Sequence, residues 1–407
     1  NTGLAGEQLG LVLAQQEIDL LVHDEEFAAI VDVLVDGPKT LSESAFAAAV
    51  DALPVGTSVD RPEPAGRTII LTSGTTGVPK GAARRTPKGV GALVSMIDRI
   101  PLHVGDRILI AAPIFHTWGY AALQLSFGMS ATVILRRRFD PRDVVEVLEG
   151  ERVQAMFAVP VMLQRMIEQL PADPGGTVRR LSLRVVATSG SAYPSGFTTR
   201  FMDEYGDVLY NLYGSTEASW ICIATPSDLR RHPDTAGTPP LGTVVRLLDA
   251  DGAEVPDGET GRIFCGNEMV FEGYTSGGSK EFIDGMVSTG DMGHRADGLY
   301  FIDGRDDDMV ISGGENVYPS EVEGLLVAHP AVREVSVVGV PDPNFGQRLA
   351  AFIALEPGAE LSADGVRDLV RSQRARHCVP REVVFLDELP RNTTGKILTR
   401  ELKARFV

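Results

Sequence analysis

Residues 72–81 read Thr72-Ser73-Gly74-Thr75-Thr76-Gly77-Val78-Pro79-Lys80-Gly81 and follow the apolar run 68–71. The glycines let backbone amides converge without obstruction by a Cβ atom, and the hydroxyls and the lysine add further donors. Such a loop suits a polyphosphate. It is not a Walker A loop, because no Gly-Lys-Ser/Thr ends it. A flexible surface turn is the alternative interpretation.

Around this loop, short β-branched runs alternate with helical stretches up to about residue 215. The expected strands are 20–22, 68–71, 107–111, 132–135, 155–159 and 183–187, and the expected helices are 141–149 and 161–169. Alternation of this kind favours parallel sheets covered by helices. From about 240 to 303 the pattern changes to short strands, such as 244–248 and 261–265, separated by Gly and Asp turns. That pattern favours an antiparallel sheet or a small barrel.

A third region follows Gly304. It contains expected helices at 320–328 and 362–374 and expected strands at 332–340, 349–355 and 382–386. We therefore predict an α/β protein with a large N-terminal domain (1–304) of doubly wound sheets, which includes a small barrel-like region (220–303). A small α+β C-terminal domain (305–407) follows, and its length is ordinary for a domain.

Bulk properties restrict the function. The 407 residues are too many for one core, and a net charge of −17 argues against general nucleic-acid binding. Cys222, Cys265 and Cys378 are far apart, so neither a disulfide framework nor a zinc ribbon is expected, and a reducing cytoplasm fits best.

The apolar run 121–135 is interrupted by polar residues and is expected to form a buried helix and strand. Because the chain starts at Asn1 without Met, we expect a segment to precede it.

The glycine-rich stretch resembles the signature loop of the adenylate-forming superfamily, which includes acyl-CoA synthetases, luciferases and peptide-synthetase adenylation domains. In that family the loop holds the β- and γ-phosphates of ATP. The resemblance extends in the family's motif order to Lys396, and it implies that the C-terminal domain is mobile. It also implies that Thr76 joins the Mg²⁺ site. The loop residues implied in ATP binding are Thr72, Ser73, Gly74, Thr75, Thr76, Gly77 and Lys80.

Two further motifs resemble the family's adenine side. Residues 188–194 resemble its adenine-side turn, which implies nucleotide contacts for Gly190, Ser191 and Ala192. Residues 210–217 resemble the next motif closely. The resemblance implies that Tyr213 stacks on adenine, Asn211 bonds its exocyclic amine, Gly214 joins the nucleotide site, Thr216 faces phosphate and Glu217 holds Mg²⁺. A hard carboxylate oxygen suits a hard cation. The alternatives are a core aromatic for Tyr213 and a helix N-terminal acid for Glu217.

Residues 288–291 and 304–308 resemble the ribose and hinge motifs. A carboxylate can accept hydrogen bonds from both ribose hydroxyls, so Asp291 is the expected ribose ligand. By resemblance, Arg305 contacts the ribose or the α-phosphate, and Asp307 is the pivot between the domains. A solvated turn is the alternative for Asp291 and for Asp307.

The last motifs concern the second substrate and the catalytic cation. Residues 311–319 resemble the loop that lines the thiol tunnel in CoA ligases, which implies CoA contacts for Gly313, Gly314 and Glu315. A strand-to-helix turn is the alternative. Residues 390–397 resemble the family's final motif, which makes Lys396 the adenylation lysine rather than a solvated surface lysine.

The segment 112–120 resembles the family's acyl-site lining, with His116 as a gate or pocket wall. A core or surface histidine is the alternative. The acidic residue that amino-acid-activating domains use to hold the substrate ammonium is missing after Phe115, which argues against a peptide-synthetase adenylation domain. Nothing in the sequence fixes the chain length of the acid, and a hydrophobic acyl group of medium or long chain is expected. The basic run 136–138 could meet a CoA phosphate or a membrane surface, and a solvated strand end is the alternative.

The sequence therefore predicts a cytoplasmic acid–thiol ligase whose catalytic residues are Lys396, Glu217 and Thr216. It would use ATP and Mg²⁺ to convert a carboxylic acid, expected to be a fatty acid, into acyl-AMP. Coenzyme A would then accept the acyl group. A fatty acyl-AMP ligase that loads a carrier protein and a nucleotide-binding non-enzyme are the alternatives. Peripheral membrane contact and the oligomeric state stay open.

Overall fold

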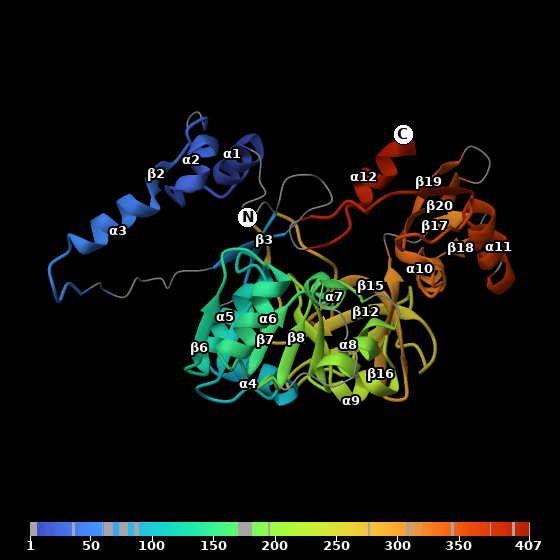
Figure 1. Cartoon of the computed structure of the whole chain (residues 1–407), viewed down its shortest axis with the longest axis horizontal. Helices are drawn as coiled ribbons and strands as arrows, with labels where there is room; N and C mark the ends of the chain where they lie inside the picture. The colour runs from blue at the N-terminus through green and yellow to red at the C-terminus, as the bar shows by residue number, and fades with distance from the viewer. Residues whose placement is uncertain are drawn as a thin grey trace. The chain divides into compact units, whose positions relative to one another are not determined.

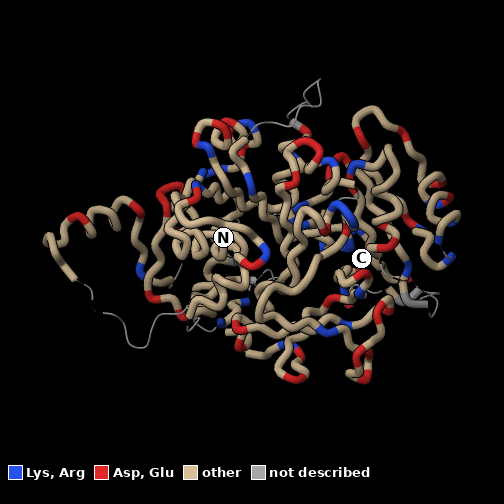
Figure 2. Tube along the Cα trace, turned by 90° about the horizontal axis from the view of Figure 1, so that it is seen from below, with Lys and Arg blue, Asp and Glu red and all other residues tan. Residues whose placement is uncertain are grey.

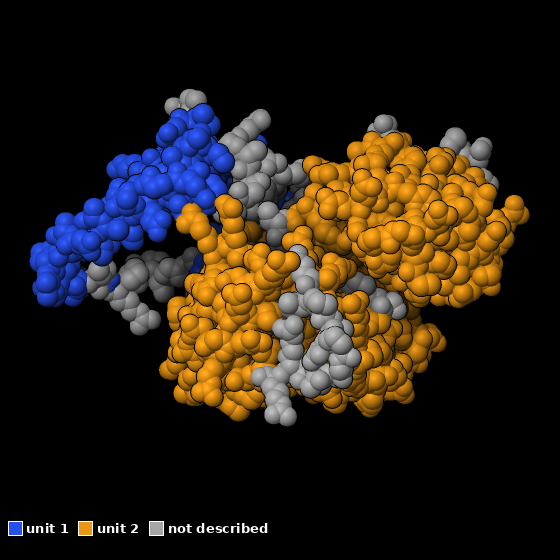
Figure 3. Space-filling view, in the orientation of Figure 1, with its two compact units in different colours: residues 1–88, 269–280 blue, residues 89–268, 281–407 orange. Residues whose placement is uncertain are grey.

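A computed structural model describes the chain except for residues 1–5, 35–36, 59, 61–67, 73–79, 85–88, 170–180, 194–195, 276, 307–309, 313–314, 318, 343–345, 375, 393–394 and 407. The chain divides into two compact units (Figure 3). The first comprises residues 1–88 and 269–280, and the second comprises residues 89–268 and 281–407. The predicted boundary at residue 304 is not tested by this division and stays a prediction.

The first unit contains a parallel strand pair and a three-stranded antiparallel sheet. Its elements are α1 (Gly6–Gln15), β1 (Leu20–His23), η1 (Glu25–Phe27), α2 (Ala28–Val31), β2 (Lys39–Ser42), α3 (Glu43–Asp51), β3 (Ile69–Thr72), β4 (Lys80–Ala83) and β13 (Gly273–Tyr274) (Figure 1). β1 and β2 are parallel, and the antiparallel sheet has the order β13-β4-β3. Its centre requires Gly81, because a Cβ atom there would lie 2.5 Å from Thr275 Oγ1. Thr72 and Lys80, at the two ends of the glycine-rich stretch, therefore lie in paired antiparallel strands, and β13 extends the same sheet by pairing Gly273 with Ala83.

The second unit is built on a six-stranded sheet of order β10-β9-β8-β7-β5-β6. Its strands are β5 (Arg107–Ile110), β6 (Thr132–Leu135), β7 (Ala155–Ala158), β8 (Val185–Thr188), β9 (Leu209–Ser215) and β10 (Ser219–Ala224). The accompanying helices are α4 (Gly91–Arg99), α5 (Thr117–Gly128), α6 (Pro141–Gly150), α7 (Pro160–Gln169), α8 (Phe197–Tyr205) and α9 (Pro226–Arg231). All strand pairs are parallel except β9–β10. The predicted α/β fold is confirmed.

Local signals explain these helices and strands. α6 starts where Asp140 accepts hydrogen bonds from two backbone amides and Pro141 occupies the first turn, a favourable helix start. β7 and β8 are buried along their whole length, as expected for strands covered on both faces. The run 121–135 forms the end of α5 and β6, which confirms the predicted helix and strand. The predicted burial is only partly confirmed, because Phe127 is 63% and Leu135 is 47% exposed. Among the described residues, no helix is both long and apolar enough to cross a bilayer.

A second sheet is antiparallel, as the short strands with Gly and Asp turns predict. Its strands are β11 (Val244–Leu248), β12 (Gly261–Gly266), β14 (Phe282–Ile283), β15 (Met286–Ala296) and β16 (Leu299–Arg305). The order is β11-β12-β15-β14, with β16 also paired to β15. That last pairing sets Asp291 opposite Arg305.

The remaining elements form an α+β module. They are β17 (Val310–Ser312), β18 (Glu315–Val317), α10 (Pro319–Val327), β19 (Val332–Asp342), β20 (Gly346–Leu355), α11 (Ala363–Gln373), η2 (Arg376–Cys378), β21 (Glu382–Phe385), α12 (Thr399–Lys403) and η3 (Ala404–Phe406). The sheet order is β18-β17-β20-β19, with β21 paired to β20. Val322 and Leu326 of α10 and Val366 and Val370 of α11 are buried in one cluster against this sheet. The helices and strands predicted after residue 304 are confirmed.

Charged residues of both signs are interleaved along the described chain (Figure 2). The full sequence carries a net charge of −17.

Candidate active site

The parallel strands deliver the site segments to one edge of the six-stranded sheet. The carboxyl ends of neighbouring parallel strands meet at the same edge, which is where ligands bind in open α/β sheets. His116 follows β5, α7 follows β7, and residues 189–192 follow β8. Thr216 follows β9 at this edge. Three chain segments that the sequence assigns to one site therefore share one end of the sheet, together with the start of α7.

The tip of the β9–β10 hairpin carries Thr216 and Glu217. Ser215 Oγ accepts a hydrogen bond from the Ala218 amide at 3.0 Å and so shapes the turn. Gly214 is required beside it, because a Cβ atom at this position would lie 2.1 Å from the Ser219 carbonyl oxygen. The tip thus presents a carboxylate and a hydroxyl as oxygen donors, and this chemistry fits Mg²⁺.

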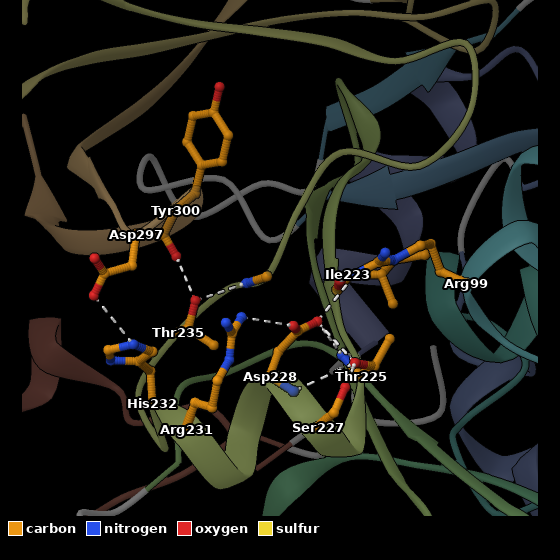
Figure 4. Close-up of polar contacts among 11 residues, drawn as sticks. Arg99, Ile223, Thr225, Ser227, Asp228, Arg231, His232, Thr235, Asp297 and Tyr300 are labelled. Carbon is orange, nitrogen blue, oxygen red and sulfur yellow. Dashed lines mark hydrogen bonds and ion pairs between the residues drawn. The ribbon is translucent and has the colours of Figure 1, made fainter. Parts of the chain in front are cut away.

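A buried polar network fixes β10 at its other end (Figure 4). Arg99 of α4 donates to Asp228 Oδ2 at 3.0 Å and to the Ile223 carbonyl at 3.4 Å. Asp228 and Thr225 form a capping box at the start of α9. Strand, loop and helix are therefore linked through one carboxylate, which anchors the hairpin on the side away from its tip.

Tyr213 of the six-stranded sheet and Asp291 of the antiparallel sheet of β11, β12, β15, β14 and β16 contact each other. The Tyr213 hydroxyl donates to Asp291 Oδ2 at 2.6 Å. Burial raises the pKa of Tyr213 well above its ordinary value, and the neighbouring Asp291 charge raises it further. Arg305 Nη1 lies 3.9 Å from Asp291 Oδ1. The predicted adenine and ribose residues are thus in direct contact, with the predicted Arg305 beside them.

The turn after β8 lies beside Asn211. Thr188 is the partner of Asn211 in the β8–β9 register, and Gly190 two residues later has a φ of +111° that favours glycine. The hydroxyls of Thr188 and Tyr193 are hydrogen-bonded to each other, which closes the turn. Gly190, Ser191 and Ala192 are exposed, whereas Thr188 is buried. The turn can therefore face a ligand while its base is held in the core.

His116 caps the start of α5, next to the hairpin tip. Thr117 Oγ1 lies 3.2 Å from Thr216 Oγ1, so the acyl-site segment touches the predicted phosphate residue. Burial lowers the pKa of His116, which favours the neutral imidazole. The helix packs closely against the preceding segment, since a Cβ atom at Gly119 would lie 2.2 Å from the Pro113 carbonyl oxygen. Thr117 was not predicted, although its position beside His116 was a usable signal.

The loop 391–397 presents Lys396 as an exposed side chain. Its backbone amide donates to Asn392 Oδ1 at 2.9 Å. Arg391 donates to the Gly395 carbonyl at 2.6 Å and pairs with Glu334 at 3.1 Å, so it braces the loop. A Cβ atom at Gly395 would lie 2.3 Å from Val161 Cγ1 of α7. The loop thus lies against the helix that starts at the site edge of the sheet. Sequence reasoning did not identify Arg391.

The phosphate loop and the CoA loop are described only at their ends. Ser73, Gly74, Thr75, Thr76 and Gly77 lie outside the described residues, as do Asp307, Gly313 and Gly314. Thr72 ends β3 opposite Lys80 at the start of β4, and Glu315 begins β18 opposite Ser312. Lys80 Nζ lies 5.5 Å from the Tyr274 ring centroid, within range for a cation–π contact.

Comparison with known proteins places this geometry in a family. Residues 1–275 match the AMP-binding enzyme family, and residues 321–396 match the AMP-binding enzyme C-terminal domain. The chain is 34% identical to an indoleacetate–CoA ligase from Aromatoleum aromaticum, over 100% of this chain and 83% of the relative. It is 31% identical to a fatty acid–[acyl-carrier-protein] ligase from Streptomyces coeruleorubidus, over 100% of this chain and 81% of the relative. The structure of ATP-bound MatB from Rhodopseudomonas palustris superposes with a TM-score of 0.87 at 27% identity, over 100% of this chain and 82% of that one.

Proposed function

The chain belongs to the AMP-binding enzyme family, and from this premise we propose that it converts an apolar carboxylic acid into its acyl-adenylate and then into its acyl-CoA thioester. The family lies within the adenylate-forming superfamily, and the chain is an acid–thiol ligase that uses ATP, Mg²⁺ and coenzyme A. The observation that carries the proposal is the meeting of three segments at one sheet edge. The hairpin tip with Thr216 touches the segment of His116. The loop of Lys396 lies against α7 at the same edge.

The first half-reaction needs positive charge rather than proton transfer. A carboxylate oxygen of the acid attacks the α-phosphorus of ATP, the bond to the β-phosphate breaks, and pyrophosphate leaves. Lys396 places its ammonium between the two anionic reactants and stabilises the charge that develops. Glu217 and Thr216, with Thr76 by motif resemblance, would hold Mg²⁺, and the bound ion would supply further positive charge to the phosphates.

Binding of the nucleoside part of ATP is divided between the six-stranded sheet and the antiparallel sheet that contains β15. Tyr213 and Asn211 on β9 and the turn 190–192 take the adenine, and Asp291 on β15 takes the ribose. Lys80 and the loop 72–77 take the β- and γ-phosphates. Half-buried and exposed positions at the turn and the hairpin support this division, because a ligand can reach them from solvent.

The second half-reaction transfers the acyl group. The thiol sulfur of CoA attacks the acyl carbon, the bond to the AMP oxygen breaks, and the thiol proton passes to solvent. Gly313 and Gly314 line the approach of the thiol. Asp307 is the pivot of the C-terminal domain, and movement about it replaces the groups that act in adenylation by those that act in thiol attack. These three assignments rest on the motif resemblance.

The acyl group we propose is apolar, either an aromatic acid or a fatty acid. Phe115 lies next to His116, with ring centroids 4.8 Å apart, and Trp118 is buried against Phe157 at 5.2 Å. Burial favours a neutral His116, and residues 112–120 contain no acidic residue that could hold a substrate ammonium. The named relatives act on indoleacetate and on fatty acids, so a panel of both classes is the appropriate screen.

A carrier-protein thiol is the second candidate acceptor. One relative of 31% identity is named as a ligase for fatty acids and the acyl carrier protein. Consumption of free CoA separates the two acceptors, because a carrier-protein ligase releases pyrophosphate and accumulates acyl-AMP whether or not CoA is added.

Lys396→Ala tests the proposed function. The variant is expected to lose acyl-AMP formation and to retain conversion of supplied acyl-AMP and CoA into thioester. Lys403→Ala, a change in the same C-terminal segment, is the matched control and should retain both steps. Pyrophosphate release and thioester formation are measured separately over the acid panel. Unchanged pyrophosphate release in the Lys396 variant would exclude the assigned role.

A further inference from the structure

The contact between Tyr213 and Asp291 joins the adenine side of the site to the ribose side. Tyr213 lies on β9 of the six-stranded sheet, whereas Asp291 lies on β15 of the antiparallel sheet. Their side chains meet through a hydrogen bond of 2.6 Å from the phenol hydroxyl to Oδ2 of the carboxylate. A ring that only stacked on a base would not need this hydroxyl.

The surroundings hold Asp291 from more than one side. Its backbone amide donates to Thr289 Oγ1 at 3.0 Å, and the Thr289 hydroxyl donates to the Ile263 carbonyl at 3.1 Å. Arg305 approaches the other carboxylate oxygen, Oδ1, at 3.9 Å. The Asp291 side chain is 15% exposed, so its carboxylate has few other orientations available.

We propose that Tyr213 is a positioning residue for ribose recognition, and that its hydroxyl orients the Asp291 carboxylate toward the ribose hydroxyls. The proposal rests on the proposed function, which makes Asp291 the ribose ligand. Each carboxylate oxygen can accept two hydrogen bonds, so Oδ2 can serve Tyr213 and one ribose hydroxyl together. Without the phenol hydroxyl, the carboxylate is free to turn toward Arg305.

The hydroxyl is available over the whole physiological pH range. Burial and the charge of Asp291 both raise the pKa of Tyr213, so the phenol keeps its proton and remains a donor. A hydrogen bond to a charged acceptor is stronger than one between neutral groups. The contact can therefore hold the carboxylate before the nucleotide arrives, which reduces the cost of ordering on binding.

Tyr213→Phe is the decisive variant, because it retains the ring and removes only the hydroxyl. Binding of AMP and of 2′-deoxyAMP is measured by calorimetry on the full chain, with Tyr210→Phe on the same strand as the matched control. AMP binding is expected to weaken about tenfold in the Tyr213 variant, the scale of one hydrogen bond to a charged group. Binding of 2′-deoxyAMP is expected to change less than about twofold, so the preference for ribose is lost.

A second readout separates positioning from general damage. In steady state, Tyr213→Phe should raise KM for ATP in pyrophosphate release and leave kcat near that of the wild type. In an Asp291→Asn background, Tyr213→Phe should have little further effect, since the two side chains act as one unit.

Three outcomes would overturn the inference. AMP binding equal to the wild type would mean that the ring suffices. Equal weakening of both nucleotides, with a lowered melting temperature, would mean that the hydroxyl supports the fold only. Failure of the folded wild type to bind AMP would remove the inference together with the proposed function. Loss of ribose preference without any pyrophosphate release would instead support the inference and contradict the proposed function alone.

Discussion

Glu217 is the residue whose assigned role is simplest to test by metal titration. Glu217→Gln retains the size of the side chain and removes the charge that favours a hard divalent cation. The variant is expected to need several-fold more Mg²⁺ for half-maximal pyrophosphate release. Glu204→Gln on α8 is a suitable control, because Glu204 forms an ion pair with Arg200 one helical turn away. An unchanged Mg²⁺ requirement in the Glu217 variant would exclude its role as the metal ligand.

His116 should make stability depend on pH in one direction. Burial lowers its pKa below the ordinary value of 6.5, so the folded state binds the proton less readily than the unfolded state. Its contribution to stability is therefore present above the unfolded pKa and is lost as the pH falls through the folded pKa. The free energy of unfolding should drop as the pH falls below about 6.5, and His116→Gln should reduce that drop. Urea unfolding of both proteins at each pH measures it, and equal slopes would contradict the prediction.

The sequence identified the residues of the nucleotide site, but it did not identify the contacts between their side chains. Tyr213, Asp291 and Arg305 were all predicted for the nucleotide site, and the structure brings them together. The direct hydrogen bond between Tyr213 and Asp291 was not predictable, because the residues are 78 apart in sequence and lie on different sheets. The contact between Thr117 and Thr216 was not predictable for the same reason, since the two residues are 99 apart in sequence.

The hairpin β9–β10 depends on one glycine. A Cβ atom at Gly214 would lie 2.1 Å from the Ser219 carbonyl oxygen, and a backbone atom cannot move aside as a flexible side chain could. Gly214→Ala is therefore expected to lower the free energy of unfolding by about 3 kcal/mol. Gly150→Ala at the end of α6 has nothing within 4 Å and is the control, with a change below about 1 kcal/mol. Urea unfolding that fails to separate the two variants would contradict this steric account.

Elements with strong local signals were predicted well. β6 and β11 have the predicted bounds, and α11 begins after Ser362, whose side chain accepts from the Gly365 amide at 3.0 Å. The pairing of β13 with β4 was not predictable, because β13 has only two residues and its partner is far away in sequence. Nothing local in so short a strand distinguishes it from a turn.

The compact units also reflect pairings between distant segments. Residues 269–280 belong with residues 1–88 because β13 joins the sheet of β3 and β4. A single domain boundary placed in the sequence would instead group residues 269–280 with the residues that precede and follow them in the chain. Motif order gave the positions of the candidate site residues, whereas the division into units depends on strand pairing that only the coordinates supply.

Asp307 lies outside the described residues, and its role as the pivot stays a proposal that concerns the whole molecule. The two half-reactions need different groups at the same acyl carbon, so one position must absorb a change in backbone angle. Asp307→Pro fixes φ near −65° and should block that change. The variant is expected to form acyl-AMP at a near-normal rate and then to stall before thioester formation.

Asp307→Ala is the matched control, because it removes the same side chain and leaves φ free. It should complete both half-reactions. Pyrophosphate release in a single turnover and thioester formation from supplied acyl-AMP measure the two steps separately. Lys396→Ala should show the opposite pattern, since Lys396 acts only while charge develops at the α-phosphate. If the proline and Lys396 variants lose the same step, one arrangement of groups serves both reactions and Asp307 is not a pivot.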